Sequence, residues 1–443
     1  MSFPKYPKYK DSGVAWLGEV PEHWGSFPLK YIATIKTGYA FSSDDFIEEG
    51  IPVLRIGDIN TEGKVDLSKA QFLPDNYSVS NSDVLVKKGD IVMAMTGATI
   101  GKAGLYLEPY PSLLNQRVCL FRVKQPNLQG YLWWILTAAF YADHITLESV
   151  GGAQPNISDY KLLQCAIPTP SSIEQTLIST FLDAETAKID TLVSEQKRLI
   201  ELLKEKRQAV ISQAVTKGLN PDVPMKDSGV EWLGAVPEGW EVKPMRMIAN
   251  IVRGASPRPA GDPRYFGGDE VPWVTVAEIT KNNSIYLTET ESFLTQEGSI
   301  HSNLFSRGTL IYSNSGATLG VPKILSLDAC ANDGVVAFLN LSNEVNAEFL
   351  FHYLASITDS IREKVRQGSG QPNLNTDIVK NLRFGLPPLG EQDVIVTRIA
   401  ELINQFDTLT TEAHRAIALL QERRTALISA AVTGQIDVRN YIV

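Results

Sequence analysis

Only three cysteines occur among the 443 residues, and Cys119, Cys165 and Cys330 are widely spaced. An odd number of scattered cysteines excludes a disulfide framework and is typical of a reducing cytoplasm. The chain also lacks an uninterrupted apolar run of membrane-spanning length. Its first ten residues, MSFPKYPKYK, contain no apolar core of a signal peptide. We therefore expect a cytoplasmic protein with no membrane partner.

Motifs for catalysis are also missing. The five histidines are dispersed, and none has the spacing of metal ligands. No GxGxxG motif follows a predicted strand, no nucleophile elbow is present, and the Asn-Pro-Pro-aromatic tetrapeptide of amino-methyltransferases is absent. GATIGK at 97–102 is one residue shorter than a phosphate-binding loop, and GATLGV at 316–321 replaces its lysine with valine. A glycine turn between strands is the better interpretation, and we expect no catalytic residue, metal or cofactor in this chain.

An excess of basic residues is likewise absent, because the formal net charge is −9. A protein that binds DNA by itself usually has a basic surface. Either this chain does not bind DNA, or it contacts a few phosphates while partners supply the remaining positive charge.

What the sequence does contain is a repeat. KDSGVAWLGEVPEHW at 10–24 returns at 226–240 as KDSGVEWLGAVPEGW, with 12 of 15 positions identical. The same holds for GATIG and GATLG, for QPN at 154–156 and 371–373, and for LLKEKRQAVISQAVT at 202–216 and LLQERRTALISAAVT at 419–433. Because the offset stays at 216–219 residues, the chain consists of two copies of one globular unit.

Each copy ends in a stretch without glycine or proline, at 174–217 and 391–433, which predicts a long helix. Ser171 and Glu174 suggest a capping box, and Gly218 and Gly434 suggest C-terminal caps. A core helix of an ordinary domain is the alternative, but two matching helices more readily pair with each other, antiparallel about a pseudo-two-fold axis. We place the first seam at Ile178, Leu182, Glu185, Ile189, Leu192, Gln196, Leu199, Leu203, Lys206, Val210 and Ala214, and the second 217 residues later.

Short strand-like runs separated by glycine and proline dominate the rest of each copy, with helices expected near 129–142 and 347–365. The predicted fold class is α+β: two mixed α/β domains separated by two long antiparallel helices that form a coiled coil. The expected boundaries are 1–172 for the first domain, 173–217 for the first helix, 218–390 for the second domain, 391–434 for the second helix and 435–443 for a tail.

Taken together, the twice-repeated order of these motifs resembles the specificity subunit of type I restriction-modification enzymes. The order is an opening motif, a glycine turn, GGAQPN or GSGQPNLN, Glu-Gln and a long helix. The resemblance implies two target-recognition domains, each of which recognises one half of a bipartite, asymmetric DNA site. It also implies that the helices set the spacer and dock two methyltransferase subunits, and that restriction and translocase subunits join the complex.

By the same resemblance the chain is not catalytic, and S-adenosylmethionine, ATP and Mg²⁺ belong to partner subunits. One alternative is a duplicated DNA-binding or scaffold protein outside restriction. Another is a single-chain nuclease or methyltransferase with unrecognised motifs.

The two copies differ most in loops, where base-contacting Arg, Lys, Asn and Gln side chains are expected. The candidates in the first copy are Lys36, Thr37, Gly38, Tyr39, Arg55, Thr96, Thr99, Lys102, Gln154 and Asn156. Those in the second copy are Arg253, Ser256, Arg258, Asn314, Ser315, Thr318, Arg366, Gln371 and Asn373. The glycines also suit turns, and residues 115–117 suit a sheet edge. Trp16, Leu17 and Trp24, with Trp232, Leu233 and Trp240, are expected to pack each domain against the helix base.

Overall fold

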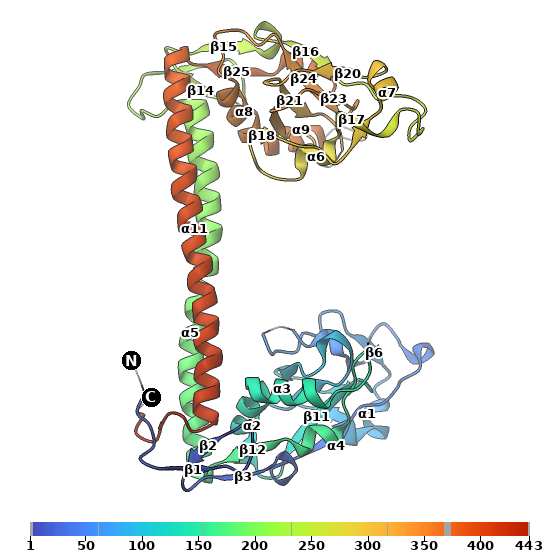
Figure 1. Ribbon diagram of the computed structural model, residues 1–443, viewed down its shortest axis with the longest axis vertical. Coiled ribbons are helices and arrows are strands. Elements are labelled where there is room, and N and C mark those ends of the chain that lie inside the picture. Colours follow the sequence, from blue (N-terminus) through green and yellow to red (C-terminus); the bar gives the residue numbers. More distant parts are fainter. Residues whose placement is uncertain are drawn as a thin grey trace. The chain divides into compact units, whose positions relative to one another are not determined.

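The computed structural model describes residues 3–441 apart from Thr61, Ala153, Trp232, Ala317 and residues 367–373, and it leaves the side chains of 364–366 undescribed. The chain divides into two compact units, residues 1–197 with 414–443 (unit 1) and residues 198–413 (unit 2). Each unit combines one globular domain with parts of two long helices (Figure 1). These helices are α5 (Ser172–Lys217) and α11 (Leu389–Val432).

Two four-stranded sheets form the domain of unit 1, in the orders β4-β11-β8-β9 and β6-β5-β10-β7. Alternate residues of β8 and β11 are buried on opposite faces, because successive side chains of a strand point to opposite sides. Val92 and Leu120 pack between the sheets, whereas Met93 and Phe121 pack toward the helices. The strands are β4 (Ala33–Thr37), β5 (Ile51–Leu54), β6 (Gln71–Leu73), β7 (Leu85–Val86), β8 (Ile91–Ala94), β9 (Ala103–Leu105), β10 (Ser112–Leu114) and β11 (Val118–Val123).

The helix expected near 129–142 is two helices, α2 (Gln129–Thr137) and α3 (Ala139–Glu148), because Ala138 between them has extended backbone angles. The other elements of this domain are β1 (Tyr9–Asp11), β2 (Glu19–Pro21), β3 (Gly25–Pro28), α1 (Tyr77–Ser80), α4 (Asp159–Gln164) and β12 (Ala166–Thr169). Pairing of β3 with β12 joins the start of the domain to the strand that precedes α5.

Unit 2 repeats this plan with sheets in the orders β16-β24-β21-β22-β18 and β19-β17-β23-β20. The strands are β13 (Met225–Asp227), β14 (Ala235–Pro237), β15 (Glu241–Pro244), β16 (Asn250–Arg253), β17 (Phe266–Val274), β18 (Tyr286–Leu287), β19 (Phe293–Leu294), β20 (Asn303–Phe305), β21 (Leu310–Ser313), β22 (Pro322–Leu325), β23 (Ala329–Ala331), β24 (Val335–Leu339) and β25 (Arg383–Leu386). The helices are α6 (Val276–Thr280), α7 (Gln296–Ile300), α8 (Ala347–Ser356), α9 (Thr358–Arg366) and α10 (Thr376–Asn381). Here too, a helix expected at 347–365 is divided, at Ile357.

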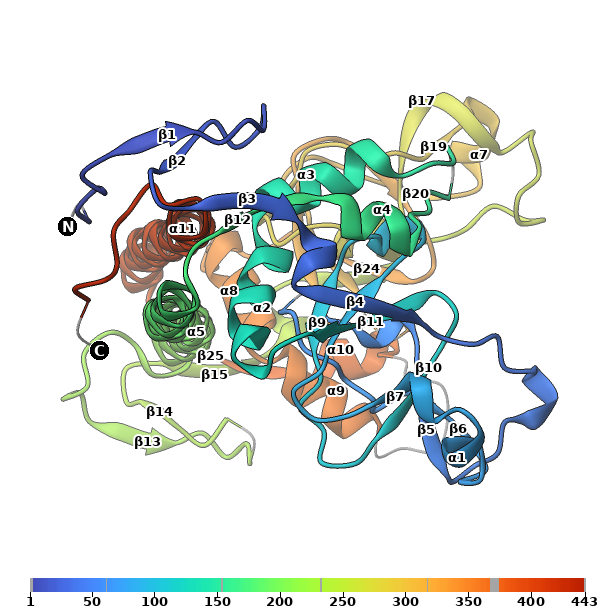
Figure 2. The same ribbon diagram turned by 90° about the horizontal axis from the view of Figure 1, so that it is seen from below.

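The opening motif of each copy forms a hairpin at a helix end. The β1–β2 hairpin lies by the end of α11 in unit 1, and the β13–β14 hairpin lies by the end of α5 in unit 2 (Figure 2). Trp24 and Trp240 are buried and donate their indole N–H to Glu174 and Glu391, at 3.3 and 3.1 Å. Each tryptophan therefore joins the start of one long helix to the end of the other, within one unit.

Leu17 and Leu233 are buried as expected, but Trp16 is not packed at the helix base. Its ring stacks on Phe140 of α3 with centroids 4.1 Å apart, and 42% of it is exposed. Trp232 lies outside the described residues.

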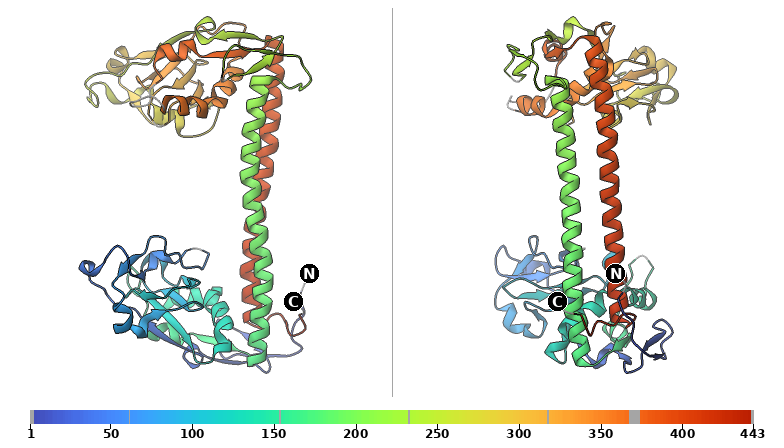
Figure 3. Two further views of the ribbon diagram at one scale, coloured as in Figure 1. Left: turned by 180° about the vertical axis from the view of Figure 1, so that it is seen from behind. Right: turned by 90° about the vertical axis from the view of Figure 1, so that its left-hand side faces the viewer.

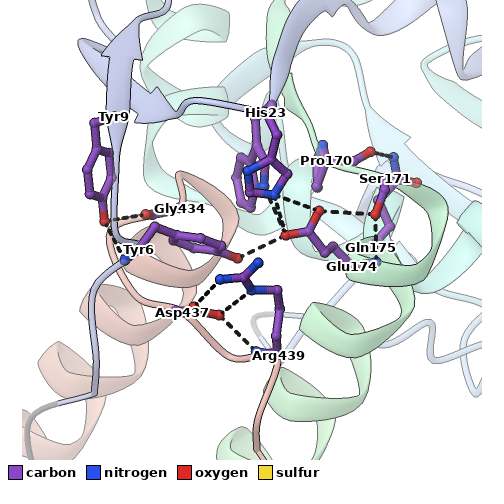
Figure 4. Close-up of polar contacts among 11 residues, drawn as sticks. Tyr6, Tyr9, His23, Pro170, Ser171, Glu174, Gln175, Gly434, Asp437 and Arg439 are labelled. Carbon is purple, nitrogen blue, oxygen red and sulfur yellow. Dashed lines mark hydrogen bonds and ion pairs between the residues drawn. The ribbon is translucent and has the colours of Figure 1, made fainter.

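In unit 1, the Glu174 side chain contacts residues near the start of the chain and at the start of α5 (Figure 4). Its carboxylate accepts hydrogen bonds from His23 at 2.9 Å and from the Ser171 hydroxyl at 3.0 Å, besides that from Trp24. The Ser171 hydroxyl accepts a hydrogen bond from the Glu174 backbone amide at 3.3 Å, which is one half of the expected capping box. The Glu174 side chain, which would form the other half, accepts from His23, Trp24 and the Ser171 hydroxyl instead. The C-terminal tail also contacts the start of the chain, because the Arg439 guanidinium lies 4.8 Å from the Tyr6 ring centre. The same guanidinium pairs with Asp437 within the tail.

The glycine caps of both long helices are confirmed, with φ of +79° at Gly218 and +75° at Gly434. Within each unit α5 and α11 lie side by side (Figure 3). The predicted seam was wrong at five positions, which are exposed, whereas its other positions are buried or half-buried. The five are Leu192, Leu199 and Lys206 on α5 and Leu409 and Arg423 on α11. Leu192 and Leu199 are 45% and 42% exposed, whereas the neighbouring Val193 is partly buried against the core of unit 1. Adjacent apolar residues at these positions left two registers open, and only packing chose between them.

Candidate nucleic-acid interface

Two candidate loops of unit 1 leave the same end of one sheet as the turn before β11. Strand pairing places Thr37 opposite Cys119 and Cys119 opposite Met93. The loop after β4 (36–39), the turn before β11 (115–117) and the turn after β8 (96–102) therefore emerge together. We call these three segments, with residues 154–156, the loop end of unit 1.

The loop after β4 lies directly on the turn before β11. A Cβ atom on Gly38 would lie 2.1 Å from the carbonyl oxygen of Leu114, so only glycine fits there. Tyr39 pairs with Asn115, and the amide of Gln116 donates to the Tyr39 carbonyl at 3.0 Å. Gly38, one of the predicted DNA contacts, thus allows the backbone of the loop to lie against the backbone of the turn. The side chains on either side of it, Thr37 and Tyr39, are exposed.

The predicted loops at 96–102 and 154–156 of unit 1 meet each other. Thr96 pairs with Asn156, and the amide of Gly97 donates to the Pro155 carbonyl at 2.8 Å. Gly97 and Gly101 have positive φ, as a glycine turn requires. The hydroxyls of Thr96 and Thr99 are buried and, among the described residues, have no hydrogen-bond partner. Lys102 is half-buried at the base of this turn, whereas Gln154 and Asn156 are exposed.

Charges at this end differ in how freely they can reach a ligand. Lys36 lies 4.0 Å from Asp83, and the Tyr39 hydroxyl donates to the same carboxylate at 3.1 Å, which raises the pKa of Tyr39. The guanidinium of Arg55 donates to the Gln71 side chain at 3.0 Å and to the Lys69 carbonyl at 2.7 Å. Arg55 is thus occupied in bracing its own loop, and its contact with DNA stays a prediction.

The equivalent loops of unit 2 gather around one acid. Ser256 donates to the Asp333 carboxylate at 2.8 Å, and Arg258 lies 3.3 Å from it. Arg253 donates to the Asp333 carbonyl at 2.5 Å. These three predicted residues belong to the loop after β16 (253–258), and they are brought together at the turn before β24. We call this loop, and the loop after β4 in unit 1, the first loop of each unit.

Asn314, after β21, joins the same end of unit 2, because its amide donates to the Gly334 carbonyl at 2.9 Å. Its side-chain amide is buried and has no hydrogen-bond partner among the described residues. Ser315 and Thr318 continue this turn, and the Thr318 carbonyl accepts from Ser313 at 2.9 Å. The side chain of Arg366 and all of Gln371 and Asn373 lie outside the described residues.

Residues 115–117 were predicted only as a sheet edge, and Gln116, Arg117 and Asp333 were not among the predicted DNA contacts. Both Gln116 and Arg117 are exposed at the loop end of unit 1. The triplets Asn-Gln-Arg and Asn-Asp-Gly, each between two apolar runs, marked the turn in each copy. Only strand pairing shows that the turn lies beside the first loop.

Comparison with known proteins identifies the family. The model of the type I restriction modification DNA specificity domain matches the chain twice, at residues 21–202 and 237–418. The chain belongs to this family. It therefore carries two DNA specificity domains, and this relationship favours the type I interpretation over a duplicated scaffold outside restriction.

Relatives with the same domain order extend along almost the whole chain. The StySPI specificity subunit of Salmonella potsdam is 23% identical over 95% of this chain and 91% of its own length. The EcoKI specificity subunit of Escherichia coli K12 has the same identity and coverage. The fold is shared with the HsdS subunit from Thermoanaerobacter tengcongensis, with a TM-score of 0.56, 17% identity and coverage of 94% and 98%. A chain of a type I R-M system reaches a TM-score of 0.68 at 16% identity, with coverage of 93% and 98%.

Two kinds of feature are absent from the described part of the chain. No helix there is long and apolar enough to cross a membrane. No group of three or more His, Cys, Asp or Glu side chains there is placed to hold a metal ion.

Proposed function

We propose that this chain supplies the DNA specificity of a type I restriction-modification complex, with each domain recognising one half of a bipartite, asymmetric site. One observation carries the proposal. The loop ends of the two units share backbone contacts, including a glycine against the turn, but present different side chains. Base readout depends on the donors and acceptors that side chains offer, so one scaffold with two sets of side chains suits two different half-sites.

An exchange of residues 25–170 for those of a relative with another target tests this assignment. Methylated sites in the genome of a host carrying the exchanged gene are expected to change in one half and keep the other half and the spacer. A change in both halves would contradict the assignment of one domain to one half-site.

The chemistry of the complex is assigned to partner subunits, which bring S-adenosylmethionine, ATP and Mg²⁺. Support comes from the extent of the family match, which takes up both domains and much of both long helices. Incubation of the purified chain with labelled S-adenosylmethionine and DNA is expected to give no transfer, and transfer without a partner would refute this assignment. We place the complex in the cytoplasm, with double-stranded DNA, two methyltransferase subunits and the restriction and translocase subunits as partners.

The net charge of −9 fits a protein whose DNA is also held by its partners. Much of the affinity for DNA comes from phosphate neutralisation. The isolated chain is therefore expected to bind its site weakly at physiological salt, and nanomolar binding without partners would contradict this.

The two long helices are proposed to pair as an antiparallel coiled coil that sets the spacer. An ion pair within each unit supports this, Asp190 with Arg424 at 3.0 Å in unit 1 and Arg207 with Asp407 at 2.8 Å in unit 2. From Asp190 to Arg207 the position on α5 advances by 17 residues, while the position on α11 falls by 17. Opposite directions along the two helices are expected of an antiparallel pair.

A docking patch for a methyltransferase subunit is proposed on the helices of each unit. In unit 1, Leu192 and Leu419 are 45% and 56% exposed. In unit 2, Leu202 and Leu409 are 50% and 47% exposed. These are the same two positions of the repeat, because Leu192 corresponds to Leu409 and Leu202 to Leu419. Two equivalent patches suit two copies of one partner.

Heptad positions indicate that each patch lies on one side of the helix pair. In unit 1, Leu192 lies two helical turns beyond Glu185 on α5. The charge of Arg423 on α11 lies near Glu185 and helps to lower the pKa of Glu185. Glu185 and Arg423 thus share a side of the pair. Leu192 follows Glu185 by seven residues and Leu419 precedes Arg423 by four, so both project to that side.

Substitution of one patch tests the docking. Leu192→Gln with Leu419→Gln is expected to reduce the methyltransferase subunits per chain from two to one in native mass spectrometry. Leu202→Gln with Leu409→Gln should do the same, and the four substitutions together should abolish binding. Leu147→Gln, on α3 at an 84% exposed position, is the control. Two bound subunits in both paired variants would refute these patches.

A further inference from the structure

The turn that precedes the central strand is built alike in both units but has different side chains. It is Asn115-Gln116-Arg117 before β11 and Asn332-Asp333-Gly334 before β24. The backbone N–H of each asparagine donates to the neighbouring strand, Asn115 to the Leu54 carbonyl and Asn332 to the Val274 carbonyl, at 3.0 Å each. The second and third positions of the turn therefore occupy equivalent places in the two units.

Each turn lies against the glycine of the first loop. A Cβ atom on Gly38 would lie 2.4 Å from the Asn115 carbonyl oxygen, and one on Gly254 would lie 2.2 Å from that of Asn332. This contact holds the loop and the turn at one separation in both units. The side chains of the turn consequently face the side chains of the first loop, where base contacts are proposed.

In unit 2 the turn holds the first loop through Asp333. Its carboxylate engages Ser256 at 2.8 Å and Arg258 at 3.3 Å, although the Arg258 side chain is 70% exposed. The third position is Gly334, where a Cβ atom would lie 2.9 Å from the Ser315 hydroxyl oxygen. A longer side chain has no room there, so Asp333 supplies the only charged side chain of this turn.

In unit 1 the turn has no such role. The side chains of Gln116 and Arg117 are exposed, and within the described part of the chain neither side chain forms a hydrogen bond or ion pair. Glutamine forms paired hydrogen bonds with adenine and arginine with guanine in the major groove. These two side chains therefore have the chemistry of base contacts and are not occupied by the protein.

We infer that this turn determines specificity in both domains, but in opposite ways. In unit 1, Gln116 and Arg117 contact base edges themselves. In unit 2, Asp333 is a positioning residue that holds Ser256 and Arg258 in the arrangement that contacts the bases. The inference rests on the proposed function, because it names the residues through which each domain would recognise its half-site.

The test uses the chain assembled with its methyltransferase subunits and a set of duplexes. The duplexes carry the methylated site of the host genome with every single-base substitution. Asp333→Asn keeps the shape but removes the charge, so Arg258 is released. Preference at one or more bases of one half-site is expected to fall about tenfold, while methylation of mismatched duplexes rises. Arg117→Ala is expected to lower preference by about tenfold in the other half only.

Matched controls separate specificity from general damage. Glu401→Gln breaks an exposed pair with Arg398 on α11, and Lys124→Ala removes a charge just beyond the opposite end of β11 from Arg117. Both should retain base preference in both halves. Melting temperatures of all variants report folding. If the role of Asp333 were merely structural, Asp333→Asn would lower the melting temperature, and base preference would not change in one half-site alone.

The outcomes also separate this inference from the proposed function. If the unsubstituted complex methylates no bipartite site, the proposed function fails. If it does, but Asp333→Asn and Arg117→Ala leave every base preference unchanged, or both act on the same half, the inference is overturned and the proposed function stands.

Discussion

Replacement of Glu174 by alanine is expected to destabilise unit 1 more than replacement of Glu391 destabilises unit 2. The two glutamates hold the same position in the repeat, near the starts of α5 and α11, and each accepts a hydrogen bond from a buried indole. Only Glu174 also accepts from a histidine, His23 at 2.9 Å. In the second copy Gly239 replaces that histidine.

The loss of stability in each variant follows from the hydrogen-bond donors that lose the glutamate as their acceptor. A buried indole N–H without its acceptor costs about 1–3 kcal/mol, and this loss is common to both variants. His23 is half-exposed and regains water, so its contact adds only about 0–1 kcal/mol. The Ser171 hydroxyl, which donates at 3.0 Å, adds about 0.5–1.5 kcal/mol. Glu174→Ala should therefore cost roughly 0.5–2.5 kcal/mol more than Glu391→Ala.

Hydrogen exchange measured by mass spectrometry can follow the two units separately in one chain. Peptides around Trp24 should exchange faster in Glu174→Ala, and peptides around Trp240 should exchange faster, by a smaller factor, in Glu391→Ala. Equal acceleration in the two variants, or none at Trp24, would refute the reasoning.

The same contact predicts a dependence on pH. Burial opposes ionisation of Glu174, but hydrogen bonds from His23, Trp24 and Ser171 outweigh it, and the pKa is lowered. A carboxyl whose pKa is lower in the folded state stabilises that state above the unfolded value of about 4.3. Protection around Trp24 should thus fall as the pH drops below this value, and Glu174→Gln should remove most of that fall.

Three further predictions concern single positions. Gly38→Ala, whose Cβ atom would meet backbone at 2.1 Å, should lower the melting temperature and half-site recognition far more than Gly97→Ala, which has positive φ but open space and should cost about 1 kcal/mol. Burial lowers the pKa of His352 to about 4, so the free energy of unfolding of unit 2 should fall by about 3 kcal/mol as the pH drops from 6.5 to 4. Denaturant titrations of His352→Gln should show a weaker dependence on pH, and an unchanged dependence would contradict this assignment. Removal of residues 435–443 exposes the contacts of buried Val438 and should speed hydrogen exchange in unit 1 by an amount equivalent to about 2–3 kcal/mol, with unit 2 unaffected.

The sequence by itself determined the features that depend on neighbouring residues. The repeat, the two long helices and the glycine caps at Gly218 and Gly434 were all predictable, because periodicity, proline-free length and positive φ are local properties. The glycine turn at 97–101 was predictable for the same reason. The family, too, follows from the order of motifs along the chain.

Only the tertiary structure decided which of these segments meet. Leu192 and Val193 are both apolar, so the sequence left the inner side of α5 open until packing buried one of them. The turn at 115–117 lies far along the chain from the loop at 36–39, and only the pairing of β11 with β4 brings them into contact. Strand pairing is a non-local choice that depends on the whole core, which is why Asp333 was missed while Ser256 and Arg258, its partners, were not.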